Sequence, residues 1–92
     1  MANRIVIHYC TGCRWLLRAS WMAQELLTSF ENELDEVALR PGDLGQFDIF
    51  VNDERVWCRK EASGFPEIKE LKQCVRDIIA PEKNLGHSER ND

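Results

Sequence analysis

The chain has 92 residues, of which 43% are hydrophobic and 30% are charged, and its formal net charge is -4. This length allows one domain with a modest core, and the composition is that of a globular protein rather than a disordered one. The 12 basic residues are scattered among 16 acidic ones and form no stripe suited to a phosphate backbone, so nucleic acid is not an expected partner.

Hydrophobic periodicity predicts six elements in the order β-α-β-β-β-α. A short apolar run at residues 5–9 is typical of a buried strand, and helical spacing of apolar residues follows from about Thr11 to Leu34. Pro66 suits the first position of a last helix, which Pro81 ends. The other predicted strands are residues 36–40, 46–51 and 54–59, and the predicted loops are residues 41–45 and 61–64.

The order of these elements predicts an α/β fold of two layers (α+β), with a four-stranded mixed sheet and both helices on one face. The first two strands are joined by a helix, so we expect them to be parallel with a right-handed crossover. Residues 1–81 are expected to form a single domain. Residues 82–92 have almost nothing to bury and are expected to form a disordered polar tail.

The dipeptide Asn52-Asp53 tolerates the positive φ that a tight hairpin turn requires. With these two residues at the tip, Ile49 faces Val56, and a one-residue slip would scramble the apolar side of the hairpin. The predicted core face carries Phe47, Ile49, Val51, Val56 and Cys58.

The opposite side of the hairpin carries Phe50 and Trp57 as diagonal neighbours. A chain of this length has no third helix to cover this open sheet face. One interpretation is an aromatic pair shielded by the stems of Arg55 and Arg59. The other is a contact surface, with a homo-oligomer formed through this face as the simplest cover.

The two cysteines of the C-x-x-C motif, Cys10 and Cys13, lie where the first strand ends and its helix begins. Exposed N–H groups at a helix N-terminus favour a thiolate, Arg14 adds a cation, and Gly12 relaxes the backbone for the bend between the sulfurs. In a cytosolic chain, this motif beside a β-α-β pattern indicates a thioredoxin-like redox site.

Cytosolic placement is expected because the apolar run after the N-terminus is too short for a signal peptide. Nothing approaches the roughly 20 apolar residues needed to cross a bilayer, so no membrane partner is expected. Structural disulfides are rare in the cytosol, which leaves redox chemistry, metal binding or packing for the four cysteines. Zinc would need two further ligands, and Cys58 and Cys74 qualify only formally, since both are expected to pack.

Three features together resemble the selenoprotein W-like family, also called the SelT/SelW/SelH or Rdx family. They are the motif "YCTGCRW" at residues 9–15, the segment "GQFDIFVNDERVWCRKEASGFPEIKELK" at residues 45–72, and the order of elements. The resemblance covers roughly Arg4 to Ile79. Its most specific parts are the C-x-x-C and the Gly64-Phe65-Pro66 turn that opens the last helix.

The resemblance implies a thioredoxin-like fold and a cysteine-containing homologue, with Cys13 in the position of the selenocysteine and Cys10 as its partner. It also implies thiol-based redox chemistry linked to glutathione, with Cys13 attacking and Cys10 resolving. The expected function is therefore a small cytosolic thiol–disulfide oxidoreductase or redox-regulatory protein. No bound cofactor or metal is expected; the expected partners are a thiol-containing protein or glutathione, the latter as reductant or mixed-disulfide partner.

Several assignments stay open. The alternative function is a redox-sensing interaction module with little catalytic turnover. Leu17 and Trp21 lie on the polar face of the first helix, either beneath the tail or as a partner-docking patch. Phe65 either pins the start of the last helix or forms a wall of the redox site. The candidate neighbours of the two cysteines are Thr11, Gly12, Arg14, Ser63, Gly64 and Phe65.

Overall fold

The computed structural model describes residues 2–86, and the order of its elements confirms the predicted one with a single addition, a short helix before the last. The strands are β1 (Arg4–Cys10), β2 (Glu36–Gly42), β3 (Phe47–Val51) and β4 (Glu54–Cys58). The helices are α1 (Leu16–Ser29), α2 (Arg59–Ala62) and α3 (Ile68–Ile79).

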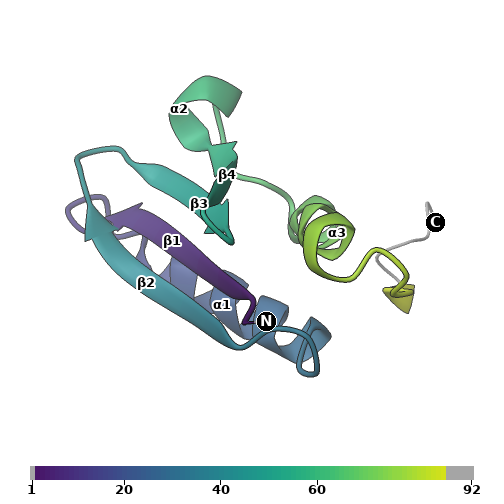
Figure 1. The fold of residues 1–92 in the computed structure, drawn as a ribbon. Coiled ribbons are helices and arrows are strands. Elements are labelled where there is room, and N and C mark those ends of the chain that lie inside the picture. Colours follow the sequence, from purple (N-terminus) through teal and green to yellow (C-terminus); the bar gives the residue numbers. More distant parts are fainter. Residues whose placement is uncertain (1, 87–92) are drawn as a thin grey trace.

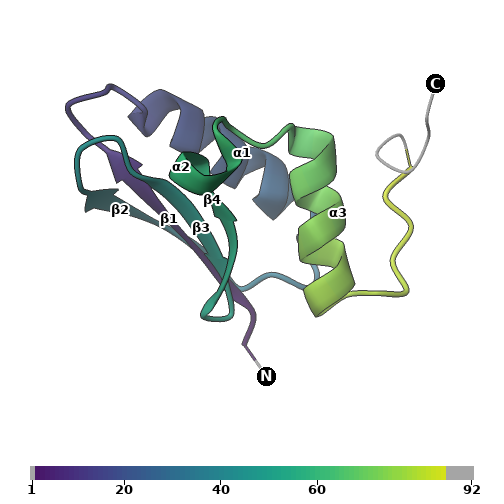
Figure 2. The same cartoon turned by 90° about the horizontal axis from the view of Figure 1, so that it is seen from above.

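The four strands form one mixed sheet in the order β2-β1-β3-β4. β1 and β2 are parallel, as expected for strands joined by a helix. β3 is antiparallel to β1, and β4 is antiparallel to β3. Both α1 and α3 lie on the same side of the sheet (Figures 1 and 2), which confirms the predicted two-layer thioredoxin-like arrangement.

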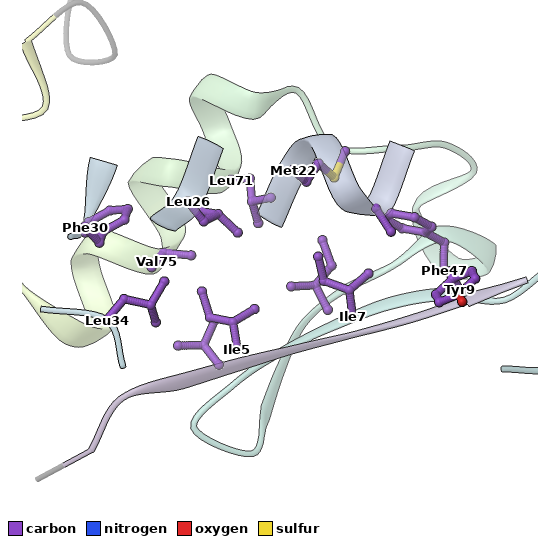
Figure 3. Packing of buried hydrophobic residues seen from close by; sticks show 13 residues of the cluster. Ile5, Ile7, Tyr9, Met22, Leu26, Phe30, Leu34, Phe47, Leu71 and Val75 are labelled. Carbon is purple, nitrogen blue, oxygen red and sulfur yellow. The ribbon is translucent and has the colours of Figure 1, made fainter. Parts of the chain in front are cut away.

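The core lies between the sheet and the two long helices (Figure 3). Ile5 and Ile7 alternate along β1 toward the helices and have no exposed surface. Leu26, on the buried face of α1, and Leu71, on the buried face of α3, pack over them. Burial of this apolar face is what fixes the strand register, because a shift by one residue would expose it.

The hairpin turn is confirmed, but the register beyond it is not. Asn52 and Asp53 have φ of 48° and 71°, as a two-residue hairpin turn requires. A β-bulge then shifts the pairing between Ile49 and Phe50, so that Ile49 pairs with Trp57 and Val56 has no partner on β3.

The bulge overturns two predictions about faces. Trp57 lies on the core side with Ile49 and packs against the core, so the predicted pair of Phe50 and Trp57 on the open face is wrong. Phe50 instead packs on His8 at a ring distance of 4.9 Å. Cys58 pairs with Asp48 on the open side, so its predicted place on the core face is also wrong. Self-association through the open face stays a prediction, with Trp57 removed from that surface.

The helices begin later than predicted. Residues 11–14 form turns, and Arg14 at a φ of 63° cannot continue a right-handed helix, so α1 starts at Leu16. α3 starts at Ile68 because Glu67 is extended, which leaves Pro66 outside the helix. The predicted loop at residues 61–64 begins within α2, which ends with Ser63 at a φ of 59°.

Of the expected tail, residues 82–86 lie within the described part of the chain. Leu85 packs against the core, and Lys83 Nζ lies 3.2 Å from Glu33 Oε2. Residues 87–92 lie outside the described residues. None of the helices found in residues 2–86 has the length and apolar character that a bilayer span requires.

Candidate redox site

The two cysteines of the motif are joined in a disulfide, with their Cα atoms 5.4 Å apart. Cys10 is the last residue of β1 and is 1% exposed, whereas Cys13 has intermediate exposure. Cys58 and Cys74 are free. The structure therefore brings together the two predicted site cysteines as a pair with one buried and one accessible sulfur.

Backbone hydrogen bonds close the turn of residues 10–15, called the redox turn below, which holds the pair. Arg14 N–H donates to Thr11 O at 3.0 Å, and Trp15 N–H donates to Cys10 O at 3.4 Å. Gly12 does not have positive φ, and the left-handed residue of the turn is Arg14. The left-handed conformation that favours glycine therefore occurs at Arg14, and a relaxing role for Gly12 stays a prediction.

The turn itself supplies a hydrogen bond to one of the two sulfurs. The N–H of Cys13 donates to Cys10 Sγ at 3.2 Å. Because α1 begins at Leu16, the cysteines precede the helix and do not occupy its first turn as expected. A donated N–H favours negative charge on the sulfur that accepts it, here Cys10 Sγ.

Phe65 connects the loop before α3 to the redox turn. Its ring lies 4.9 Å from that of Trp15 and 5.1 Å from that of Phe47, both edge to face. The guanidinium of Arg18 lies 4.0 Å from the centre of the Phe65 ring. Phe65 thus packs against the residue two positions after Cys13, which supports its interpretation as a wall of the site.

The loop that carries Phe65 is held by a side chain from β4. Trp57 Nε1–H donates to Gly64 O at 3.0 Å, a contact that only the bulged register allows. Together with Ser63, Gly64 and Phe65, the side chains of Trp15, Arg59 and Lys60 line one hollow beside the site. The three predicted neighbours on this loop thus share a hollow with Trp15, two residues after Cys13, and their part in the site stays a prediction.

A second hollow lies on the other side of the turn. It is lined by Thr11, Gly12, Arg14, Leu16, Leu17 and Ser20. Sequence reasoning missed Trp15, Arg18 and Arg59 as site residues. Trp15 has the helical spacing of a core residue and does pack against the core, and the arginines carry no spacing signal that would place them over aromatic rings.

The remaining two cysteines are free. Cys58 pairs with Asp48 on the face of the sheet away from α1 and α3. Cys74 is exposed on α3, so its predicted packing is wrong. The thiol is still partly screened from water although the residue is exposed; this partial burial raises the pKa of Cys74, and the nearby carboxylates of Asp77 and Glu70 raise it further. Within residues 2–86, no group of three His, Cys, Asp or Glu residues is placed to hold a metal ion.

Comparison with known proteins identifies relatives of the whole fold. The Rdx family profile matches residues 4–77. A selenoprotein W-related protein of Vibrio cholerae is 49% identical, with a TM-score of 0.82 over 85% of this chain and 98% of its own. A protein of Bordetella parapertussis is 57% identical, with a TM-score of 0.81 over 84% of this chain and 98% of its own.

Curated relatives are more distant. The protein named migration and invasion enhancer 1 is 32% identical over 75 residues in Bos taurus and over 74 residues in Mus musculus. These matches cover 79% and 78% of this chain. The chain spans 62% and 61% of the length of those two relatives.

Proposed function

Because the chain belongs to the Rdx family, a family of generally redox-related proteins, we propose that it is a small thiol–disulfide oxidoreductase with Cys10 and Cys13 as its reversible dithiol. The observation that carries this proposal is the unequal exposure of the two sulfurs across one closed turn. Only Cys13 is accessible to a partner, while Cys10 is 1% exposed and lies within bonding reach of it.

The exchange starts at the accessible sulfur. The thiolate of glutathione attacks Cys13 Sγ, the bond between Cys13 and Cys10 breaks, and the electron pair leaves on Cys10 Sγ. The N–H of Cys13, which donates to that sulfur, stabilises the charge. A second glutathione thiolate attacks the glutathione sulfur of the mixed disulfide. This step releases oxidised glutathione and leaves the dithiol.

The dithiol then reduces a disulfide of a partner protein. The thiolate of Cys13 attacks one partner sulfur, and the other leaves as a thiolate that takes up a proton. Cys10 next attacks Cys13 Sγ, which releases the partner's second thiol and restores the protein disulfide. Cys13 is thus the attacking residue and Cys10 the resolving one, which agrees with the assignment that the family resemblance implies.

We place this chemistry in the cytosol. Cys74 is exposed and Cys58 is partly exposed, and both are free. Free thiols with this exposure persist in a reducing compartment, where glutathione is the abundant thiol. No bound cofactor is needed for the proposed exchange, because the electrons pass between sulfur atoms.

A redox-sensing interaction module is the second candidate. It is favoured by Leu17 and Trp21, which are 81% and 47% exposed on the helix that follows the pair. Under this alternative the disulfide changes the affinity for a partner and turns over slowly. The two candidates differ in rate, since an oxidoreductase reduces a small disulfide with glutathione over many cycles.

The test uses single-cysteine variants in glutathione redox buffer. In Cys10→Ser, a glutathione adduct is expected to accumulate on Cys13, whereas Cys13→Ser is expected to gain little adduct at the buried Cys10. The wild type should reduce hydroxyethyl disulfide with glutathione, and both variants should be slower. An adduct mainly on Cys10, a disulfide that involves Cys58 or Cys74, or stoichiometric zinc would contradict the proposal.

A further inference from the structure

Apolar side chains are exposed on both sides of the redox turn. On α1, Leu16 and Leu17 are 49% and 81% exposed, and Trp21 is 47% exposed one turn further on. Leu44, at 82%, lies in the β2–β3 connection that follows Gly42, the strand partner of Cys10. Figure 2 shows this connection at the same end of the molecule as the one between β1 and α1. Exposed apolar groups gathered around a reactive sulfur indicate a contact surface.

The charge around the same turn is strongly biased. The hollows beside the pair are lined by four cationic residues, Arg14, Arg18, Arg59 and Lys60, and by no acidic residue. These four stand in a chain with 12 basic and 16 acidic residues. Glu61, next to Lys60, is paired with Arg55. The hollows beside the redox turn are therefore basic, although the protein as a whole is acidic.

The cations and the apolar groups are interleaved. Arg14, Leu17, Arg18 and Trp21 line one continuous hollow with Trp15. Arg14 and Leu17 also line the hollow that reaches Thr11 and Gly12 within the motif. A ligand held by this surface lies over the segment that contains Cys13, and it must present apolar groups beside negative charge.

We propose that this docking surface (Arg14, Leu16, Leu17, Arg18 and Trp21) binds an acidic segment of a partner protein whose cysteine is flanked by apolar residues. The inference rests on the proposed exchange at Cys13 and names the class of partner for that site. Complementary charge steers the partner to the surface, and the apolar contacts hold its sulfur beside Cys13 Sγ.

The test measures a single exchange step at Cys13. A protein with Cys10→Ser, Cys58→Ser and Cys74→Ser carries thionitrobenzoate on Cys13. An incoming peptide thiolate attacks Cys13 Sγ, forms the peptide–Cys13 disulfide, and releases the thionitrobenzoate anion, whose absorbance gives the rate. Each peptide is also reacted with free cysteine that carries thionitrobenzoate. The rate with the protein is divided by this reference rate, which removes differences in intrinsic thiol reactivity between the peptides.

The probes are peptides of about nine residues with a central cysteine. The first has leucines beside the cysteine and glutamates at both ends; the second has lysines in place of the glutamates; the third has serines in place of the leucines. Glutathione is the fourth probe. We expect the acidic leucine peptide to react about tenfold faster than each of the others at low salt, and the advantage over the lysine peptide to shrink at high salt.

Matched variants assign the effect to the surface. Arg14→Gln and Arg18→Gln should each reduce the preference for the acidic over the lysine peptide about threefold, and Leu17→Ser should reduce the preference for leucine over serine. The controls are Arg40→Gln, which removes a cation from the opposite sheet face, and Leu27→Ser, at 41% exposure further along α1. Equal rates for the four probes, or the same losses in the controls, would overturn the proposal.

Two further outcomes are decisive. A peptide with serine in place of cysteine should change the emission of Trp21 in the wild type without any exchange, and no change up to millimolar peptide would overturn the proposal. A concentration-dependent dimer that Leu17→Ser abolishes would assign the surface to a second copy and also overturn it. If the peptide preference holds while glutathione-linked turnover is absent, the docking surface stands and the oxidoreductase proposal fails. Turnover without the preference overturns the docking surface alone.

Discussion

Replacement of Phe65 measures how firmly the loop before α3 is attached to the redox turn. Phe65 has intermediate exposure and packs edge to face on Trp15 and Phe47. Such pairs contribute about 1 kcal/mol each beyond their buried area. The Arg18 guanidinium over the ring adds about 0.5 kcal/mol at an exposed site. The apolar area of a roughly half-buried ring contributes about 1.5 kcal/mol.

These contributions separate two substitutions. Phe65→Ala loses all of them, and its free energy of unfolding should fall by about 4 kcal/mol. Phe65→Leu keeps most of the apolar area and loses the ring contacts, so its unfolding free energy should fall by about 2.5 kcal/mol. Both losses are large beside a total stability of about 5–15 kcal/mol for a small domain.

The assay is urea unfolding followed by circular dichroism, on fully oxidised and fully reduced protein separately. Leu44→Ala is the control, because Leu44 is 82% exposed and should change the unfolding free energy by less than about 0.5 kcal/mol. A double-mutant cycle of Phe65→Leu with Arg18→Met isolates the cation–π contact. If Phe65→Leu has the same free energy of unfolding as the wild type, the ring contacts of Phe65 contribute nothing beyond their buried apolar area. The contributions assigned above to the aromatic pairs and to Arg18 would then be wrong.

Three further predictions concern other parts of the structure. In the reduced protein, limiting iodoacetamide at neutral pH should label Cys13 at least about tenfold faster than Cys10, because Cys10 is 1% exposed. Preferential alkylation of Cys10, found by mass mapping, would reverse the roles of the two sulfurs. The pKa of Cys74 is raised by burial and then by Asp77 and Glu70, so its alkylation rate should reach half-maximum at a higher pH than that of an unfolded peptide, and Asp77→Asn should lower that pH. The folded protein favours the protonated thiol of Cys74. Its contribution to the free energy of unfolding is therefore present below the ordinary cysteine pKa and is lost as the pH rises through the raised pKa of the folded state. Urea unfolding of the wild type and of Cys74→Ser at several pH values is the check, because the serine variant should not show this loss of stability. Gln46 accepts a hydrogen bond from Asp43 N–H at 2.8 Å and donates one to Asp48 Oδ2 at 2.9 Å. Gln46→Ala removes both bonds and should lower the free energy of unfolding by about 1–2 kcal/mol. Gln46→Glu, which keeps the acceptor but sets a charge beside Asp48, should be at least as destabilising, and a neutral result for Gln46→Ala would show that Asp48 has other partners.

Much of the fold follows from the apolar pattern, because the pattern records burial directly. The burial of Ile5 and Ile7 on β1 and the positive φ of Asn52 and Asp53 both have local causes, and a buried strand and a tight turn were predicted at these places. The position of the cysteine pair follows from the same reasoning, since a strand end and a helix start fix it. The crossover explains the parallel pair β1 and β2, and the hairpin explains the antiparallel pair β3 and β4. The pairing of β3 with β1 was not predicted.

The bulge could not be predicted in this way. Val56 and Trp57 are consecutive apolar residues, so an extra residue in β4 leaves the alternation readable in either register. The choice depends on a tertiary contact, the bond from Trp57 Nε1 to Gly64 O, which lies seven residues further along the chain. The placement of Cys58 on the open side of the sheet has the same origin. Likewise, the late start of α1 results from the left-handed Arg14, a conformation that composition does not signal.

The burial of Cys10 at the end of β1 has a kinetic consequence for any partner bound through Cys13. Cys10 is anchored by its pairing with Gly42, and its Cα stays 5.4 Å from that of Cys13. A sulfur held in this way attacks a mixed disulfide at an effective concentration far above that of free cellular thiols, which are at about millimolar levels. The residence time of a partner is therefore set inside the protein by closure of one small ring. A partner leaves the wild type at its own intramolecular rate, and the same partner stays on Cys10→Ser until an outside thiol arrives.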